Sequence, residues 1–312
     1  MRKAALSLAI IGLALAFLAA APAQALDART WVSGTGDNAN PCSRTAPCRT
    51  FDAAISAAAA GGEVNCLDAG SFGSASNPQV TITKAITISC EAGTAGVQAT
   101  SGGGIVIFIQ AATTDVVTLR GLNIDGQGTG IVGIQINSAK AVHVEKCTIR
   151  NFPSGAGVDI PLLSTTIFLF VTDTVISGNS YGIILESSGG YKVASLRNVV
   201  ITGSAATGLY LNNSNVYANV TKSIISGSGG PAVVTGASNA IANIDRSTIA
   251  NNAYGLWAAA SGSIIRVSGN NIYNNTTGFL IAPGAQIQSD NTNNTGGSNG
   301  GAGVPNALLT KN

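Results

Sequence analysis

Val117-Thr-Leu-Arg-Gly-Leu-Asn-Ile124 and Val142-His-Val-Glu-Lys-Cys-Thr-Ile149 are two copies of one pattern, and this pattern decides the fold. Its closing isoleucine recurs at intervals of 23 to 27 residues, at Ile124, Ile149, Ile176, Ile201, Ile225, Ile249 and Ile272. A glycine, or once an alanine, opens a second apolar run at intervals of 23 to 26 residues, at Gly133, Gly157, Gly182, Gly208, Ala232, Gly255 and Gly278. Two markers in phase indicate stacked units, each too small to bury its own apolar face.

Each copy alternates apolar and polar residues and is broken by a two-residue corner, which predicts short strands with one buried face. One corner column contains residues suited to positive φ, namely Gly126, Asn151, Gly178, Gly203, Gly227, Asn251 and Asn274. The coils lack helical periodicity and the leucine and asparagine spacing of leucine-rich repeats. We therefore predict an all-β fold, a single-stranded parallel β-helix (solenoid) of about 24 residues per coil.

The N-terminal part adds three recognisable segments: Trp31-Val-Ser-Gly-Thr-Gly-Asp37, Pro47-Cys-Arg-Thr-Phe-Asp-Ala-Ala-Ile55 and Ala60-Gly-Gly-Glu-Val64. With these segments, the chain resembles the right-handed parallel β-helix proteins of the pectate-lyase-like superfamily over Thr30 to Ile287. We expect Thr50 to cap a short helix that plugs the open end of the coil stack. The apolar side of this helix would carry Phe51, Ala54, Ile55 and Ala58.

Residues 1–25 have the pattern of a cleaved secretory signal peptide, because Arg2 and Lys3 precede an apolar run that ends in Ala23-Gln-Ala25. A membrane anchor is the alternative, but the run is short, and we expect no stable membrane span after signal removal. We predict a cap segment with a disulfide loop at 26–65, the β-helix at 66–288 and a flexible Asn/Gly-rich tail at 289–312. The protein would then be secreted or periplasmic.

Without residues 1–25 the chain has 14 basic and 14 acidic residues, so nucleic acid is not an expected partner. In an oxidising compartment, paired cysteines form disulfides. Cys42 and Cys48 bracket a tight loop, while Cys66 and Cys90 flank the first expected strand layer. We therefore favour the pairs 42–48 and 66–90, although other connectivities stay open. Cys147 is left over at an interior position, and we expect a buried, inert thiol.

Six charged residues find an opposite charge on the neighbouring coil, where equivalent residues lie about 4.8 Å apart. The expected pairs are Arg120 with Glu145, Lys146 with Asp173, and Asp125 with Arg150.

Enzymes of the superfamily act on acidic polysaccharides with clustered aspartates and a histidine, or with carboxylate-bound calcium and a basic residue. Neither pattern carries over, because the chain has no Asp-Asp pair and its single histidine, His143, falls at an outward strand position. The Asp-Pro-His-Glu signature of related epimerases is also missing. We expect no cofactor, and no column stacks carboxylates into a calcium site.

Two outward features remain as candidate sites. Asp159 and Glu186 lie on neighbouring coils, displaced by two residues, with α-carbons about 8 Å apart, a spacing that suits an acid and a base. Two isolated, solvated acids are the simpler interpretation. The second feature is the column two residues after each opening glycine, which becomes apolar or aromatic over its last five coils: Gln135, Asp159, Ile184, Tyr210, Val234, Trp257 and Leu280. Such a line indicates a binding surface, or a face covered by a loop, the tail or a second subunit.

Three functions fit these features. The first is an exported, non-catalytic protein that binds a polysaccharide, a cell-surface glycan or another surface along one face of the solenoid. The second is a polysaccharide lyase or glycoside hydrolase acting on uronate-containing polymers through Asp159 and Glu186. The third is a self-associating structural or adhesive protein. The absence of a recognisable catalytic constellation favours the first.

Overall fold

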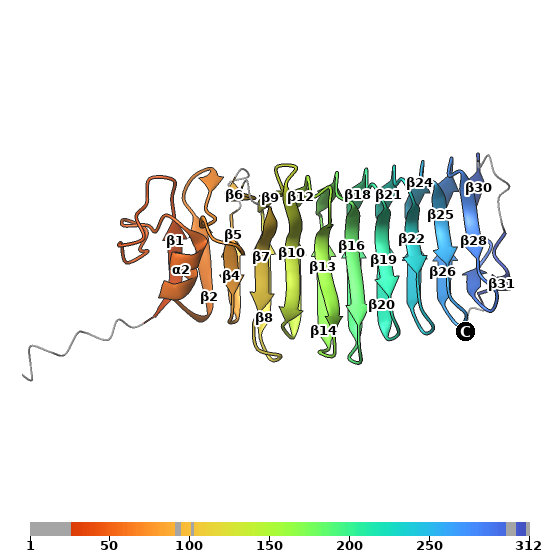
Figure 1. Cartoon of the computed structure of the whole chain (residues 1–312), viewed down its shortest axis with the longest axis horizontal. Helices are drawn as coiled ribbons and strands as arrows, with labels where there is room; N and C mark the ends of the chain where they lie inside the picture. Colours follow the sequence, from red (N-terminus) through yellow and green to blue (C-terminus); the bar gives the residue numbers. More distant parts are fainter. Residues whose placement is uncertain (1–25, 91–94, 101–102, 298–303, 310–312) are drawn as a thin grey trace, which may run out of the picture.

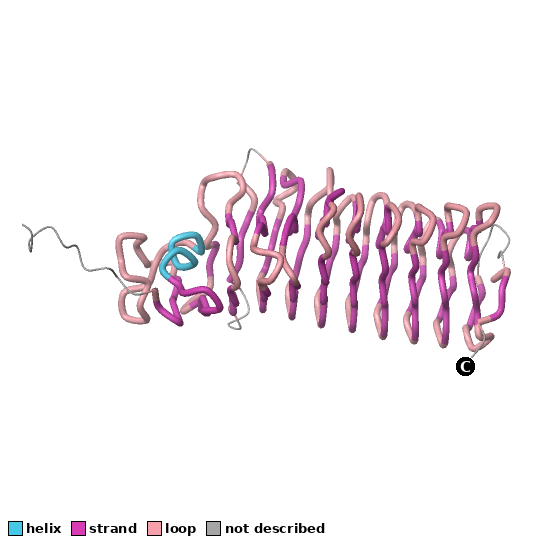
Figure 2. The backbone as a smooth tube through the Cα atoms, turned by 90° about the horizontal axis from the view of Figure 1, so that it is seen from below, coloured by secondary structure: helices cyan, strands magenta, loops and turns pink. Residues whose placement is uncertain are grey.

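The repeated strands form three parallel sheets that run along the length of the molecule (Figure 1). The computed structural model describes residues 26–90, 95–100, 103–297 and 304–309, so the predicted signal peptide lies outside the described residues. Each coil contributes one strand to each sheet, and Figure 2 shows the coils stacked side by side along one axis. The predicted all-β parallel solenoid is confirmed.

Sheet A has twelve strands: β1 (Asp27–Val32), β2 (Ala58–Cys66), β5 (Ile86–Ser89), β8 (Val116–Arg120), β11 (Ala141–Glu145), β14 (Ile167–Thr172), β17 (Lys192–Arg197), β20 (Val216–Thr221), β23 (Ile241–Asp245), β26 (Ile264–Ser268), β29 (Gln286–Ser289) and β31 (Ala307–Leu308). Sheet B has ten: β3 (Gly70–Ser71), β6 (Ala95–Gln98), β9 (Asn123–Asp125), β12 (Thr148–Arg150), β15 (Val175–Ser177), β18 (Val200–Thr202), β21 (Ile224–Ser226), β24 (Thr248–Ala250), β27 (Asn271–Tyr273) and β30 (Asn294–Gly296).

Sheet C has nine strands: β4 (Val80–Ile82), β7 (Gly104–Gln110), β10 (Gly130–Ser138), β13 (Ala156–Leu163), β16 (Tyr181–Ser187), β19 (Thr207–Asn212), β22 (Pro231–Thr235), β25 (Tyr254–Ala258) and β28 (Thr277–Ile281). Neighbouring strands of this sheet are parallel to one another. The outward side chains of sheet C carry the candidate site described below.

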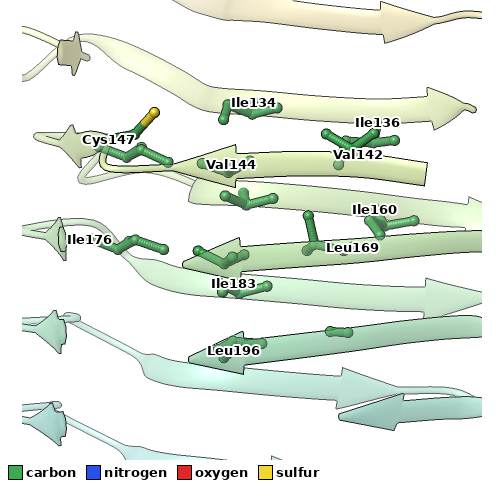
Figure 3. Close-up of a cluster of buried hydrophobic side chains, with 14 of the residues drawn as sticks. Ile134, Ile136, Val142, Val144, Cys147, Ile160, Leu169, Ile176, Ile183 and Leu196 are labelled. Atoms are coloured by element: carbon green, nitrogen blue, oxygen red, sulfur yellow. The ribbon is translucent and has the colours of Figure 1, made fainter. Parts of the chain in front are cut away.

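The interior is a continuous column of aliphatic side chains, part of which is drawn in Figure 3. The closing isoleucines stack in register from Ile124 on β9 to Ile272 on β27, and each is at most 1% exposed. Full burial of one such side chain stabilises the fold by about 1.5–3 kcal/mol. Cys147 is a free, buried thiol among them, as expected, and burial raises its pKa to about 11.

The corners of the coils are set by backbone with positive φ. Asn151, Asn251 and Asn274 adopt φ of 65°, 58° and 53°, in agreement with the sequence. Gly126 is an exception, because the left-handed residue there is Gln127, with φ of 53°. A Cβ on Gly126 would instead lie 2.2 Å from the Asn151 carbonyl oxygen, so close approach of the next coil explains this glycine.

A second corner joins sheets A and B and is the two-residue corner expected within each repeat, but its positive φ was not predicted from the sequence. Its residues have φ between 47° and 67°: Gly121, Lys146, Asp173, Asn198, Lys222, Arg246 and Gly269.

Two of the three expected ion pairs form, between Arg120 and Glu145 at 2.8 Å and between Arg150 and Asp125 at 2.9 Å. The Lys146–Asp173 pair does not occur in the described part of the chain. Asp173 sits at this corner and accepts a hydrogen bond from Asn198 at 2.7 Å instead.

The N-terminal end is closed by helix α2 (Phe51–Ala57), which lies at the end of the stack in Figure 1. The Thr50 hydroxyl accepts a hydrogen bond from the Ala53 backbone N–H, as an N-cap does. Phe51, Ala54 and Ile55 are buried as expected, whereas Ala58 is buried but already begins β2. Disulfides join Cys42 to Cys48 and Cys66 to Cys90, which is the favoured pairing.

The coil stack extends beyond both predicted domain boundaries. Strand β1 and all but the last residue of β2 lie within the segment 26–65, and β30 and β31 lie within the predicted tail 289–312, where they pair with β27 and β29. Backbone hydrogen bonding to the last coil therefore orders part of a segment whose composition indicates a loose tail. None of the described helices has the length and apolar character needed to cross a bilayer.

Candidate functional site

The outward face of sheet C presents the residue column predicted from the sequence, which we call the stripe. Its members pair directly from coil to coil, in the order Gln135, Asp159, Ile184, Tyr210, Val234, Trp257 and Leu280. Most of them are half-buried, and Val234 is only 5% exposed. The stripe is therefore a closely packed ridge of side chains rather than a set of isolated exposed residues.

A second outward column runs beside the stripe, three residues earlier in each coil, and the sequence analysis missed it. It contains Tyr181, Thr207, Pro231, Tyr254 and Thr277. Strict alternation counted back from the stripe would place this column inside the core, because the two columns are offset by an odd number of residues. The alternation is broken at two consecutive buried positions, Gly182 and Ile183 on β16, so the pattern gave no signal for this column. Because both columns carry aromatic rings, they form paired walls. Tyr181 stacks on Tyr210 with ring centroids 6.1 Å apart, and Tyr254 lies 6.1 Å from Trp257.

A groove of about 260 Å³ lies between these two aromatic pairs. Tyr181 and Tyr210 line one end, Trp257 lines the other, and Val234 and Pro231 lie on the strand between them. The Tyr210 and Trp257 strands are two coils apart, which places them about 10 Å from each other along the stack. The complete lining is Tyr181, Thr207, Tyr210, Pro231, Val234, Gly236, Trp257 and Ala259.

Gly236 allows the Tyr210 ring to reach across the next coil. A Cβ at this position would lie 2.9 Å from Tyr210 Cε2 and 3.3 Å from its hydroxyl oxygen. Any other residue would therefore push the ring away from its present position. The shape of the groove depends on this small residue as well as on the aromatic side chains.

The acid pair lies next to the Tyr210 end of the groove. Asp159 on β13 pairs with Ile184, so Glu186 lies two residues further along β16, as expected. Glu186 Oε1 accepts a hydrogen bond from Asn212 Nδ2 at 2.8 Å. Burial, and secondly the negative charge of Glu186, raise the pKa of Asp159 to about 6. Burial, Tyr181 and Glu186 also raise the pKa of Tyr210, so the carboxylate of Glu186 acts on both neighbours.

The charge on this face has one sign. Across all nine strands of sheet C, which lie entirely within the described residues, Asp159 and Glu186 are the only charged residues. No lysine or arginine of these strands stands beside the acids to balance them. Burial is the main cause of the raised pKa of Asp159 and the charge of Glu186 is the second, and no cation on these strands opposes them.

Other candidate positions lie away from the groove. His143 faces outward from β11 on sheet A and stacks on Phe170 with ring centroids 4.7 Å apart. A larger depression of about 460 Å³ opens at the C-terminal end of the stack. Part of its lining, Val304 to Leu308, belongs to the short stretch between two ranges that the structure does not describe. Neither position brings together a set of complementary functional side chains.

Parallel coils with an outward-facing groove define the class of right-handed β-helix proteins to which pectate lyases belong. Residues 111–295 match the model of the family described as periplasmic copper-binding protein (NosD), and this chain belongs to that family. The match covers more than half of the chain and includes every residue of the groove. It begins after the cap helix and the disulfides, which lie outside the matched region.

Solved structures support the same fold. The crystal structure of pectate lyase Pel9A superimposes with a TM-score of 0.64 at 15% sequence identity, covering 84% of this chain and 74% of that chain. The A-module of the mannuronan C-5 epimerase AlgE4 from Azotobacter vinelandii gives a TM-score of 0.50 at 14% identity, covering 76% and 87%. A search of curated proteins finds no match. At these identities the similarity shows the fold alone.

The family description names copper, so the side chains of types that can bind copper decide whether this chain has such a site. Copper prefers imidazole, thiolate and thioether ligands. His143 is packed against Phe170, Cys147 is buried among aliphatic residues, and the other four cysteines form disulfides. Among the described residues, no three His, Cys, Asp or Glu side chains are grouped so that they could hold a metal ion. These residues do not fit a copper site.

Proposed function

We propose that this chain is an exported, non-catalytic protein that binds a glycan along the groove of sheet C. The observation that carries the proposal is the pair of aromatic walls, with Tyr181 and Tyr210 at one end and Trp257 at the other. Sugar rings present apolar C–H faces that stack on aromatic rings. A flat, open groove with a spacing of about 10 Å between its walls can accept alternate sugar units of an extended chain.

The surroundings of the groove favour a ligand rich in hydroxyl groups. Thr207 lies in the lining, Asn212 lies beside Glu186, and the Gln135 amide donates to Asn137 at 3.0 Å on the same face. Amide and hydroxyl groups can exchange such hydrogen bonds for bonds to sugar hydroxyls. An export route is part of the proposal, because two disulfides require an oxidising compartment and the family description places its members in the periplasm.

Retention of the purified mature chain on a panel of insoluble neutral and acidic polysaccharides tests this function. Trp257→Ala should reduce retention at least about tenfold, because one stacking wall is lost, and should shift the thermal midpoint by only a few degrees. Tyr273→Ala is the matched control, since Tyr273 is a 41% exposed aromatic residue on sheet B. Equal retention of wild type and Trp257→Ala would refute the groove as the binding site. A large loss of stability would instead make Trp257 a core residue.

The raised pKa of Asp159 favours a second candidate function, cleavage of a polysaccharide. An acid with a pKa of about 6 beside a second carboxylate resembles the acid and base of a glycosidase. Incubation with each polymer, with and without calcium, should then shorten the chains, and Asp159→Asn or Glu186→Gln should abolish the shortening. Unchanged chain length for every polymer would leave binding as the function.

A further inference from the structure

We infer that the groove of sheet C selects uncharged glycans and rejects uronate polymers, and that Asp159 and Glu186 set this selectivity. This inference rests on the proposed function, because it specifies the ligand of the same groove. The structural neighbours include a pectate lyase and a mannuronan epimerase, whose names refer to acidic polymers. The face of this chain has a different chemistry.

The strands of sheet C lack a counter-charge for a uronate chain. Proteins hold the carboxylates of a uronate chain with arginine or lysine, and arginine does so through two parallel hydrogen bonds. The nine strands of sheet C, all within the described residues, contain no basic residue from β4 to β28. A polyanion laid along these strands would lose water around its carboxylates and gain no cation from the strands in return.

Asp159 and Glu186 lie where a bound glycan would pass them. Glu186 influences Tyr210 electrostatically, and Tyr210 is one of the walls on which a sugar would stack. Asp159 precedes Tyr210 by two coils in the same column, with Ile184 between them. A glycan that extends from the groove along the stripe therefore passes both carboxylates. Like charges at such an interface suppress the wrong partner more strongly than they affect the right one.

The same two acids can hydrogen-bond to a neutral sugar. A carboxylate accepts hydrogen bonds from sugar hydroxyls, and these bonds are stronger than those between neutral groups. Glu186 Oε1 is held by Asn212 at 2.8 Å, which fixes the side chain for such contacts. The same two residues can therefore bind a neutral chain and repel an acidic one.

The experiment compares the affinities of the full mature chain for hexasaccharides of equal length by calorimetry at low salt. Neutral probes are cellohexaose, mannohexaose and laminarihexaose, and acidic probes are hexagalacturonate and hexamannuronate. At least one neutral hexasaccharide should bind, and both hexauronates should bind at least about tenfold more weakly than it does. Raising the salt concentration should narrow this difference by strengthening uronate binding, because the repulsion is screened.

The double variant Asp159→Asn/Glu186→Gln identifies the residues responsible. It should bring its affinities for the neutral and the acidic hexasaccharides to within about threefold of each other, since the shapes of both side chains are kept and only their charge is removed. Asp173→Asn is the control, because it removes one negative charge at the corner between sheets A and B and should leave the difference unchanged.

The outcomes separate the two proposals. Uronates that bind as tightly as the best neutral probe, or a double variant that keeps the full difference, would overturn the selectivity while leaving glycan binding intact. Weakening of every bound hexasaccharide by Trp257→Ala would show that the measured affinity belongs to the groove. If no probe of either kind binds, the proposed function fails and this inference fails with it.

Discussion

Single positions on sheet C show how a residue's role follows from its neighbours on adjacent coils. Val234 projects outward, yet it is 5% exposed, because it is paired with Tyr210 on one side and Trp257 on the other. The register of this column could be predicted from the sequence, since the spacing of the opening glycines fixes it. The burial of Lys192 could not be predicted, because its Nζ donates to the carbonyls of Leu163, at the end of β13, and of Thr165, in the loop that follows.

Asp159 should make the stability of the protein depend on pH. Its pKa is about 6 in the folded chain against 3.8 for an ordinary aspartate, so the folded state keeps the proton over a range in which the unfolded state has lost it. The free energy of unfolding should therefore fall as pH rises from about 4 to about 6, by roughly 1–3 kcal/mol, and should stay lower above that range.

Urea denaturation at pH 4.5 and pH 7 measures this effect. In Asp159→Asn the free energy of unfolding should not fall between pH 4.5 and pH 7, because the amide cannot ionise. The difference in stability between the two pH values should therefore be smaller for this variant than for wild type. Glu186→Gln should show a smaller fall, since it removes the second cause of the raised pKa. A variant Asp159→Asn with the same pH dependence as wild type would show that this carboxyl group is well solvated.

Within the coils, polar side chains at the inner corners replace part of the apolar core and tie one coil to the next. Phe152, Ser228 and Asn252 each donate a backbone N–H to an asparagine on the following coil, at 3.1, 2.9 and 3.1 Å. A parallel ladder runs through Ser223, Ser247, Asn270 and Asn293. The strands could be predicted from alternation, but these ladders could not, because a corner asparagine looks the same in sequence whether it points inward or outward.

Asn275→Ala should destabilise the protein by about 2–4 kcal/mol, because it leaves buried partners without a hydrogen bond. Asn275 is 1% exposed, accepts from both Asn252 N and Asn252 Nδ2, and donates to the Ile249 carbonyl at 3.0 Å. Asn219→Ala is the matched control on the outer surface, where the amide contacts only Asn243 at 2.8 Å, and it should change stability by less than about 0.5 kcal/mol. Equal losses for the two variants would contradict the role of the inner ladder.

The whole molecule has two unequal ends. The N-terminal end has the cap helix α2 and two disulfides, whereas the C-terminal end has the two-residue strand β31. The existence of the cap helix could be predicted from Thr50 and the apolar positions that follow it. The order in the C-terminal segment could not, because its pairing depends on contacts with the preceding coil and its composition alone resembles that of a linker.

Replacing both Cys66 and Cys90 by serine should lower the free energy of unfolding by about 2–4 kcal/mol, since the bond restricts a 24-residue separation in the unfolded chain. Chemical denaturation of the oxidised protein and of the variant measures this difference. Glycan retention should be unchanged, because the disulfide lies several coils away from the groove. If the variant is fully folded but is no longer retained on the glycan, then the cap disulfide affects binding in the groove.

The coil register has a final consequence for the width of the groove. Because Tyr210, Val234 and Trp257 are paired residue by residue, the distance between the two aromatic walls is a whole number of coil spacings. The spacing of the walls can therefore change only in steps of one coil, about 4.8 Å each. Deleting or duplicating the single coil that carries Val234 would shorten or lengthen the ligand that fits by one coil spacing, about 4.8 Å, and would leave the aromatic walls themselves unaltered.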